Sequence, residues 1–191
     1  MNICMYGASS TDLDRIYYDA AEYLGRRIAV RGHGLVFGGG AQGLMGAAAR
    51  GLAAEGGPLT GIAPRFFDKP DILYKECSEF IFTDTMRERK ELMENLSDAF
   101  IMAPGGIGTY EEFFEVLTLK QLGQLNKPIA VFNVNGYFDL LLGLLEDTVS
   151  KGFMKASCLG IFGAFDDADE MLDYIERELV SPLDLSHLKN I

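Results

Sequence analysis

The clearest chemical signal in this chain is a glycine-rich turn followed by two carboxylates. Residues 104–112 read Pro-Gly-Gly-Ile-Gly-Thr-Tyr-Glu-Glu and directly follow the apolar run Ala99–Ala103, which predicts a buried strand. A glycine-rich turn between a strand and a helix lets backbone N–H groups approach an anion, and the helix N-terminus adds partial positive charge. We therefore expect a phosphate in this turn, with Glu111 and Glu112 facing whatever the phosphate carries.

Glu112 itself has two interpretations. Thr109 and Glu112 have the spacing of a capping box, in which both side chains only close the helix N-terminus. Glu112, Val116 and Leu119, however, lie at i, i+4 and i+7, which puts the carboxylate on an apolar helix face. A carboxylate at the edge of an apolar cleft and beside a phosphate is a candidate reactive group. The sequence leaves both interpretations open.

A second charged cluster, in the segment Met86–Lys90, places three cations at the start of a predicted helix: Arg87, Arg89 and Lys90. They could form a solvated helix face, because Glu91 and Glu94 are available for i, i+4 ion pairs. Cations at a helix N-terminus oppose the macrodipole, however, so their presence is easier to explain if an anion binds there. An arginine fork suits a phosphate or ribose hydroxyls, and a lysine adds a point charge.

The glycine loop Gly38–Gly43 also follows a predicted strand, and it formally matches the dinucleotide fingerprint GxGxxG. That fingerprint needs an acidic residue at the end of the next strand, but Leu59–Ala63 has no carboxylate there. We therefore expect no NAD site, and we interpret Gly39 and Gly40 as part of a wall around another phosphate or ribose. The structural alternative is that the glycines only permit a tight turn and close helix packing.

Short apolar runs alternate with amphipathic helical patterns along the whole chain. The predicted strands are Asn2–Tyr6, Gly34–Phe37, Leu59–Ala63, Phe80–Thr83, Ala99–Ala103, Ile129–Asn133 and Leu159–Phe162. The predicted helices are Asp12–Arg31, Leu44–Glu55, Met86–Leu96, Thr109–Leu122, Tyr137–Ser150 and Asp166–Val180. This alternation predicts a single α/β domain, a Rossmann-like doubly wound parallel sheet with helices on both faces. We assign residues 1–180 to this nucleotide-binding domain and residues 181–191 to a C-terminal tail.

In such a sheet, ligands bind beyond the carboxyl ends of the strands, near the point where strand order reverses. Three of the features fall at strand ends, in residues 7–10, 38–43 and 104–109. Ser9 lies in the first of these loops, where a serine is usually only a helix N-cap but could also reach a ligand. The convergence of the three loops predicts one binding crevice.

The composition excludes several other classes of function. With 17 basic and 28 acidic residues the net charge is −11, so we expect no nucleic-acid and no membrane partner. No uncharged apolar stretch reaches the ~18 residues of a membrane span, and the N-terminus lacks a signal-peptide pattern. The 3 cysteines form no CxxC pair and the 2 histidines have no metal-ligand spacing. The sequence therefore predicts a cytoplasmic protein without a metal or cofactor.

Taken together, these motifs resemble the LOG (Lonely Guy) family of cytokinin riboside 5′-monophosphate phosphoribohydrolases, which are often mislabelled as lysine decarboxylases. The resemblance rests on Met86–Lys90, on residues 104–112 as PGGxGTxxE, and on the glycine loop continued by Gly43–Gly46. It runs from about Asn2 to Val180 and includes residues 121–123, 126–128 and 133–137.

The resemblance implies a Rossmann-like homodimer that hydrolyses the N-glycosidic bond of a nucleoside 5′-monophosphate, such as a cytokinin riboside monophosphate or AMP. The products are a free base and ribose 5-phosphate, and the catalytic residues are Arg89 and Glu112. The residues expected to bind the substrate are Ser9, Gly39, Gly40, Lys90, Gly105, Gly106, Ile107, Gly108, Thr109 and Glu111. Positive charge develops on the ribose in this reaction, so a carboxylate beside the anomeric carbon can stabilise it and activate water.

The chain departs from the family pattern at two positions, and the second lies where the choice of base would be set. Arg87 stands where the family usually has His, and Phe66 stands where many members have a glutamate that contacts the base or nucleotide. The preferred base therefore stays open between an N6-prenylated adenine, adenine and another purine. The predicted helix from Thr109 also carries more apolar residues than one buried face needs, which suits a subunit interface near Glu112.

Two other functions compete with this one, and the sequence argues against the second. A carrier that binds a nucleotide or cofactor without hydrolysing it is the alternative, although retention of both Arg89 and Glu112 favours the enzyme. A pyridoxal-phosphate lysine decarboxylase would need a Schiff-base lysine with a site for the cofactor ring, and no lysine here has that context.

Overall fold

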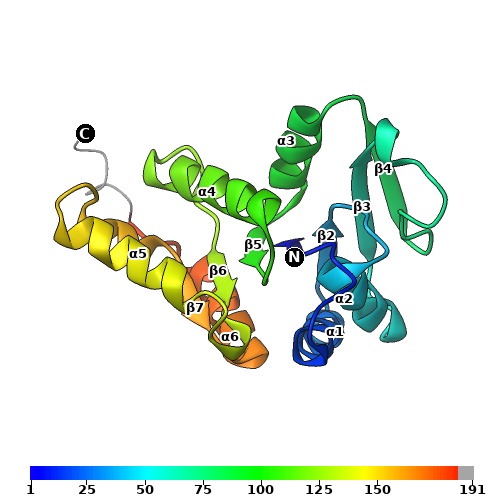
Figure 1. The fold of residues 1–191 in the computed structure, drawn as a ribbon, viewed down its shortest axis with the longest axis horizontal. Helices are drawn as coiled ribbons and strands as arrows, with labels where there is room; N and C mark the ends of the chain where they lie inside the picture. The colour runs from blue at the N-terminus through cyan, green and yellow to red at the C-terminus, as the bar shows by residue number, and fades with distance from the viewer. Residues whose placement is uncertain (185–191) are drawn as a thin grey trace.

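The apolar runs of the chain form one sheet of seven parallel strands in the computed structural model, which describes residues 1–184 (Figure 1). The strands are β1 (Asn2–Tyr6), β2 (Gly34–Phe37), β3 (Leu59–Pro64), β4 (Glu79–Thr83), β5 (Ala99–Met102), β6 (Ile129–Phe132) and β7 (Gly163–Phe165). Their order in the sheet is β4-β3-β2-β1-β5-β6-β7, and every neighbouring pair is parallel. Strand order therefore reverses at β1, between β2 and β5.

In the described part of the chain, five α-helices lie between these strands and a sixth follows β7. They are α1 (Arg15–Val30), α2 (Gly43–Ala54), α3 (Met86–Leu96), α4 (Ile107–Gln121), α5 (Asp139–Ser150) and α6 (Ala168–Val180), with short 3-10 turns η1 (Arg65–Phe67), η2 (Val134–Gly136) and η3 (Ala156–Ile161). Helices α1, α2 and α6 pack on one face of the sheet, and α3, α4 and α5 pack on the other (Figure 1). Within residues 1–184, no helix has both the length and the apolar character that a bilayer crossing requires.

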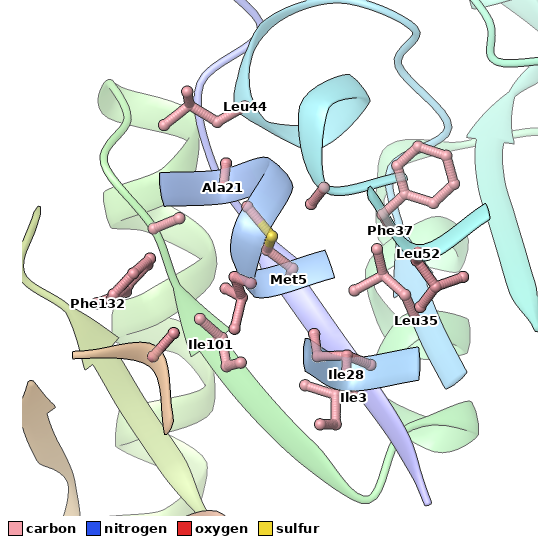
Figure 2. Close-up of a cluster of buried hydrophobic side chains, with 14 of the residues drawn as sticks. Ile3, Met5, Ala21, Ile28, Leu35, Phe37, Leu44, Leu52, Ile101 and Phe132 are labelled. Atoms are coloured by element: carbon pink, nitrogen blue, oxygen red, sulfur yellow. The ribbon is translucent and has the colours of Figure 1, made fainter. Parts of the chain in front are cut away.

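The strand residues alternate between two hydrophobic cores. In β1, Ile3 and Met5 point into the core beneath α1, α2 and α6 (Figure 2), whereas Cys4 and Tyr6 point into the core beneath α3 and α4. Successive side chains of a strand point to opposite sides, so a strand buried on both faces contributes side chains to both cores. The layered sheet confirms the predicted doubly wound α/β fold.

One predicted strand is wrong. The apolar run Leu159–Phe162 was expected to be the last strand, but residues 156–161 form the 3-10 turn η3 and the strand is β7, Gly163–Phe165. Cys158 and Ile161 are buried three residues apart, which fits one turn of a 3-10 helix and also reads as a short apolar run. Because β7 is an edge strand of three residues and only partly buried, its own sequence carries almost no strand pattern. Of the predicted C-terminal tail, residues 185–191 lie outside the described part of the chain.

Candidate active site

The carboxyl ends of β1 and β5 open into a cavity of about 540 Å³, at the point where strand order reverses. The sequence-predicted residues that line it are Ser9, Gly40, Arg89, Gly106, Ile107, Gly108, Thr109, Glu111 and Glu112. Three predicted residues, Gly39, Lys90 and Gly105, do not line it. The three loops therefore do meet in one crevice, although not every glycine in them faces it.

The phosphate end of the cavity is the N-terminus of α4. The helix begins at Ile107 with Gly106 as its N-cap, so the N–H groups of its first turn have no acceptor within the helix. These unpaired donors and the helix dipole point into the cavity, where an anion is the favoured ligand. The proposed capping box of Thr109 and Glu112 is wrong, because Thr109 lies inside the first turn and Glu112 lies in the second.

Gly105 allows the turn before α4 to pack closely against its neighbours. A Cβ atom at Gly105 would stand 2.1 Å from Thr109 Oγ1, so the turn has no room for a side chain there. The Gly105 carbonyl accepts a hydrogen bond from the Tyr137 hydroxyl at 2.8 Å, and the Ala8 N–H donates to the Pro104 carbonyl at 2.9 Å. These contacts fix the turn between β5 and α4 against the loop that follows β1.

The two predicted catalytic residues form a buried ion pair. Arg89 Nη1 donates to Glu112 Oε1 at 2.9 Å, and Arg89 Nε donates to the Ile62 carbonyl at 3.3 Å. Arg89 is 7% exposed and Glu112 is 9% exposed. Burial raises the pKa of the Glu112 carboxyl, and the neighbouring Arg89 guanidinium opposes this shift without cancelling it. The pair therefore holds a carboxylate that can take up a proton more readily than an exposed one.

Lys90 does not line the cavity but contacts α4 beside it. Its ammonium makes ion pairs with Glu111 and, at 2.7 Å, with Glu115, instead of the i, i+4 pair with Glu94. Burial lowers the pKa of Lys90, but the hydrogen bonds to the two carboxylates outweigh it and the net shift is upward. Lys90 thus joins α3 to α4 and fixes Glu111, whose side chain lines the cavity.

The cations at the start of α3 are accommodated by a capping box that the sequence analysis missed. The Glu88 N–H donates to Thr85 Oγ1 at 3.1 Å, and the Thr85 N–H donates back to the Glu88 carboxylate at 3.3 Å. The signal was present as the pattern Thr-x-x-Glu over residues 85–88. The acidic Glu88 also offsets part of the unfavourable interaction between the cations and the helix dipole.

An apolar wall of the cavity was not predicted. It consists of side chains from α2, the start of α3 and residues 65–75, which we call the strap segment: Met45, Phe67, Ile72, Leu73 and Met86. The strap segment is tied to the glycine loop by backbone hydrogen bonds from Ala41 to Ile72 and from Tyr74 to Gly39, each 2.9 Å long. The available signal was the Phe66-Phe67 pair in an otherwise polar, irregular stretch.

Gly39 supports the strap segment instead of contacting the cavity. Its φ of +74° belongs to the left-handed region that favours glycine, and a Cβ atom there would stand 2.7 Å from the Phe80 ring. Its carbonyl accepts the hydrogen bond from Tyr74. Gly39 therefore has the turn-forming role that the sequence analysis named as the structural alternative.

Comparison with known proteins places the chain among related sequences and folds. Residues 45–175 match the family model described as "Possible lysine decarboxylase". The chain is 38% identical over 175 residues to the probable cytokinin riboside 5′-monophosphate phosphoribohydrolase LOGL1 of Oryza sativa subsp. japonica, covering 92% of this chain and 78% of that protein. It is 36% identical to the cytokinin riboside 5′-monophosphate phosphoribohydrolase LOG2 of Arabidopsis thaliana, covering 92% of this chain and 82% of that protein.

Solved structures share the fold at lower identity. The molybdenum cofactor binding protein of Rippkaea orientalis superposes with a TM-score of 0.71 at 21% identity, covering 92% of this chain and 95% of that one. The molybdenum cofactor carrier protein of Chlamydomonas reinhardtii gives a TM-score of 0.70 at 22% identity, covering 94% of this chain and 98% of that one.

Proposed function

The chain belongs to the LOG family of phosphoribohydrolases, and we propose that its cavity hydrolyses the N-glycosidic bond of a nucleoside 5′-monophosphate. The products are a free base and ribose 5-phosphate. The observation that carries the site assignment is the Arg89–Glu112 pair, buried in the same cavity as the N-terminus of α4. An anion site, a carboxylate and an apolar wall in one cavity correspond to the phosphate, ribose and base of such a substrate.

In the proposed reaction the phosphate binds at Gly106, Ile107, Gly108 and Thr109 and is not cleaved. Its binding energy positions the ribose, so that C1′ lies next to Glu112. As the bond from C1′ to the base nitrogen breaks, positive charge develops on the ribose, and the Glu112 carboxylate stabilises it. Glu112 then accepts a proton from the attacking water, whose oxygen bonds to C1′. The base nitrogen takes up a proton from solvent, and Glu112 releases its own proton to solvent, which restores the carboxylate.

Arg89 has two roles in this proposal. Its guanidinium orients the Glu112 carboxylate, and its positive charge keeps a larger fraction of that carboxylate ionised than burial alone would allow. We assign the ribose hydroxyls to Glu111, which lines the cavity and is held by Lys90. Ser9 and Gly40 line the cavity from the ends of β1 and β2 and complete the substrate contacts.

A direct test is to incubate the purified protein with AMP and with N6-isopentenyl-AMP and to follow free base and ribose 5-phosphate by chromatography. Release of both products supports the proposal, and intact nucleotide after long incubation contradicts it. The second candidate is a carrier that binds its ligand without cleaving it, favoured by the shared fold of the molybdenum cofactor proteins. Tight nucleotide binding without any product would support the carrier.

The apolar wall bears on the choice of base. Phe67 is 39% exposed and lines the cavity, so truncating it removes contact area for an apolar substituent on the base. We expect Phe67→Ala to lower kcat/KM for N6-isopentenyl-AMP by about tenfold, because burying part of a phenyl ring contributes about 1–2 kcal/mol. The value for AMP is expected to change less than about threefold.

Phe66→Ala is the matched control for this measurement. Phe66 precedes Phe67 in the same turn, is 54% exposed and does not line the cavity. Its truncation is expected to leave the ratio of the two substrates unchanged. If Phe67→Ala lowers kcat/KM equally for both substrates, the apolar wall does not discriminate between the two bases.

We also propose that the protein is a homodimer. The interface expected on the helix from Thr109 finds little support, because Phe113 and Leu117 of α4 are buried within the subunit. The outer face of α5 carries Leu140, which is 90% exposed, and Leu144, which is 57% exposed, one helical turn apart. Replacing both by Lys is expected to convert a dimer to a monomer, measured by light scattering after size exclusion. Val180→Lys, at an 87% exposed apolar residue on the opposite helix layer, is the control and should leave the dimer intact. A monomeric wild type would contradict the proposal.

The cysteines and the net charge bear on the cellular location and on the type of partner. Cys4, Cys77 and Cys158 are free thiols, as a reducing compartment favours, and we propose that the protein works in the cytoplasm. The net charge of −11 supports a small-molecule substrate in preference to nucleic acid.

A further inference from the structure

Gly38 lies directly after β2, and the guanidinium of Arg89 occupies the space where its side chain would be. A Cβ atom built on Gly38 would stand 2.1 Å from Arg89 Nη2 and 3.2 Å from Arg89 Cζ. Real Cβ atoms essentially never approach another heavy atom within 3.0 Å. Any side chain at position 38 therefore requires the guanidinium to move.

The Arg89 guanidinium cannot move without losing hydrogen bonds. The end of an arginine side chain is usually flexible, but this one is 7% exposed and fixed by its bonds to the Ile62 carbonyl and to Glu112. Gly38 lies against Nη2, and the guanidinium also faces the cavity that Arg89 lines. A displacement of more than about 1 Å breaks hydrogen bonds of 2.9 and 3.3 Å, because such bonds weaken steeply beyond about 3.5 Å.

The backbone gives no other reason for a glycine at position 38. Gly39 and Gly43, in the same loop, have φ values of +74° and +62°, a region that side chains rarely adopt, whereas Gly38 does not. Apart from Arg89, the nearest atom to a Cβ at position 38 is Met45 Sδ at 3.5 Å, an ordinary contact. Gly38 also lines the cavity, and Arg89 is the one protein residue that stands closer than an ordinary contact to a Cβ atom at this position.

We propose that Gly38 is a positioning residue: the absence of its side chain holds the Arg89 guanidinium against Glu112. The role in hydrolysis rests on the proposed function, but the positioning itself does not. An alanine at position 38 would displace the guanidinium and leave the Glu112 carboxylate buried without its partner. The acid limb of the pH–rate profile, which follows ionisation of Glu112, would then move to higher pH.

The first test measures the position of the Glu112 proton without any substrate. The pKa of the Glu112 carboxyl is followed by ¹³C NMR in wild type, Gly38→Ala and Gly40→Ala. Position 40 has room for a Cβ atom, with only Met45 Cε at 3.4 Å, so this variant is the matched control for the pKa. A rise of about one unit or more in Gly38→Ala alone supports the proposal. An unchanged value in Gly38→Ala overturns it.

The second test is a double-mutant cycle with Arg89→Lys, whose shorter head lacks Nη2. Gly38→Ala is expected to lower kcat/KM by about tenfold or more in the wild-type background and by less than about threefold in Arg89→Lys. Equal factors in the two backgrounds would overturn the proposal. If Gly38→Ala alone fails to fold, folding of the double variant supports the proposal, and failure of both overturns it.

Product release by wild type and the pKa of Glu112 in Gly38→Ala test the hydrolase and the positioning role separately. Absence of product from wild type, together with the expected pKa rise in Gly38→Ala, would reject the hydrolase and retain the positioning role. Active wild type with no pKa change in Gly38→Ala would reject the positioning role and retain the hydrolase.

Discussion

Glu112→Gln is expected to slow base release by about 100- to 10,000-fold, the range that a general base contributes. The amide has nearly the shape of the carboxylate, but it can neither accept a proton from water nor stabilise positive charge on the ribose. The phosphate site at the start of α4 is untouched, so the affinity for the nucleotide should change little. Product formation by chromatography and nucleotide binding by calorimetry measure the two effects separately.

The pH dependence of the wild type follows from the same residue. Because burial raises the pKa of Glu112, the active carboxylate is lost at a higher pH than an exposed glutamate would be. We expect kcat/KM to fall on the acid side through that raised pKa. Glu112→Gln should retain a small rate without this acid limb.

Glu115→Gln is the control on the same helix. Glu115 lies less than one turn further along α4, pairs with Lys90 and does not line the cavity. Its neutralisation is expected to leave kcat/KM within about threefold of wild type. A loss in Glu115→Gln as large as that in Glu112→Gln would mean that the effect is general to acidic residues of α4.

The strands and helices could be predicted because the apolar residues of each element recur with the spacing that is typical of a strand or a helix. Central strands such as β5, and β1 after Asn2, are apolar runs because both faces are buried, and the helices between the strands have amphipathic patterns. The edge strand β7 could not be found in this way, because Gly163 and Ala164 contribute little apolar pattern. The prediction settled on the neighbouring apolar run, which forms η3.

The candidate site was predictable where a local motif marks a local structure. The turn before α4 is one such case, because its glycines, strand and helix are adjacent in sequence. The Arg89–Glu112 pair is different, since the two residues lie 23 positions apart and their contact depends on how α3 packs against α4. Lys90 shows the limit of the motif: it is next to Arg89 in sequence and also contacts α4, but it pairs with Glu111 and Glu115 and does not line the cavity.

The side chains of the strap segment that face the cavity could not be predicted from the sequence. Its residues belong to no regular element apart from the turn η1, so periodicity says nothing about which side chains face the cavity. Their placement depends on backbone hydrogen bonds to the glycine loop, more than 30 residues earlier in the case of Ala41 and Ile72. Only the tertiary structure reveals that Phe67 and Ile72 form a wall of the site.

Arg89→Met is expected to have the largest effect on stability, and that effect should depend on pH. Removing one partner of a buried ion pair costs about 3–5 kcal/mol, because the remaining charge is left without compensation. Without Arg89, the pKa of Glu112 rises further above its ordinary value. At low pH the Glu112 carboxyl is neutral in both the folded and the unfolded state, so it does not lower the free energy of unfolding. As the pH rises above the unfolded pKa of about 4.5, the unfolded state ionises more readily than the folded state, and the fold is destabilised.

The free energy of unfolding, measured with urea at pH 5 and pH 8, should therefore separate the variant from wild type much more at pH 8. Arg87→Met, which removes an exposed cation from the same helix, should cost less than about 1 kcal/mol at either pH. Adding Glu112→Leu to Arg89→Met should restore most of the stability at pH 8, because an apolar pair in this site leaves no buried charge. A loss that is equal at both pH values, and that Glu112→Leu does not reverse, would mean that Arg89 contributes packing and not charge.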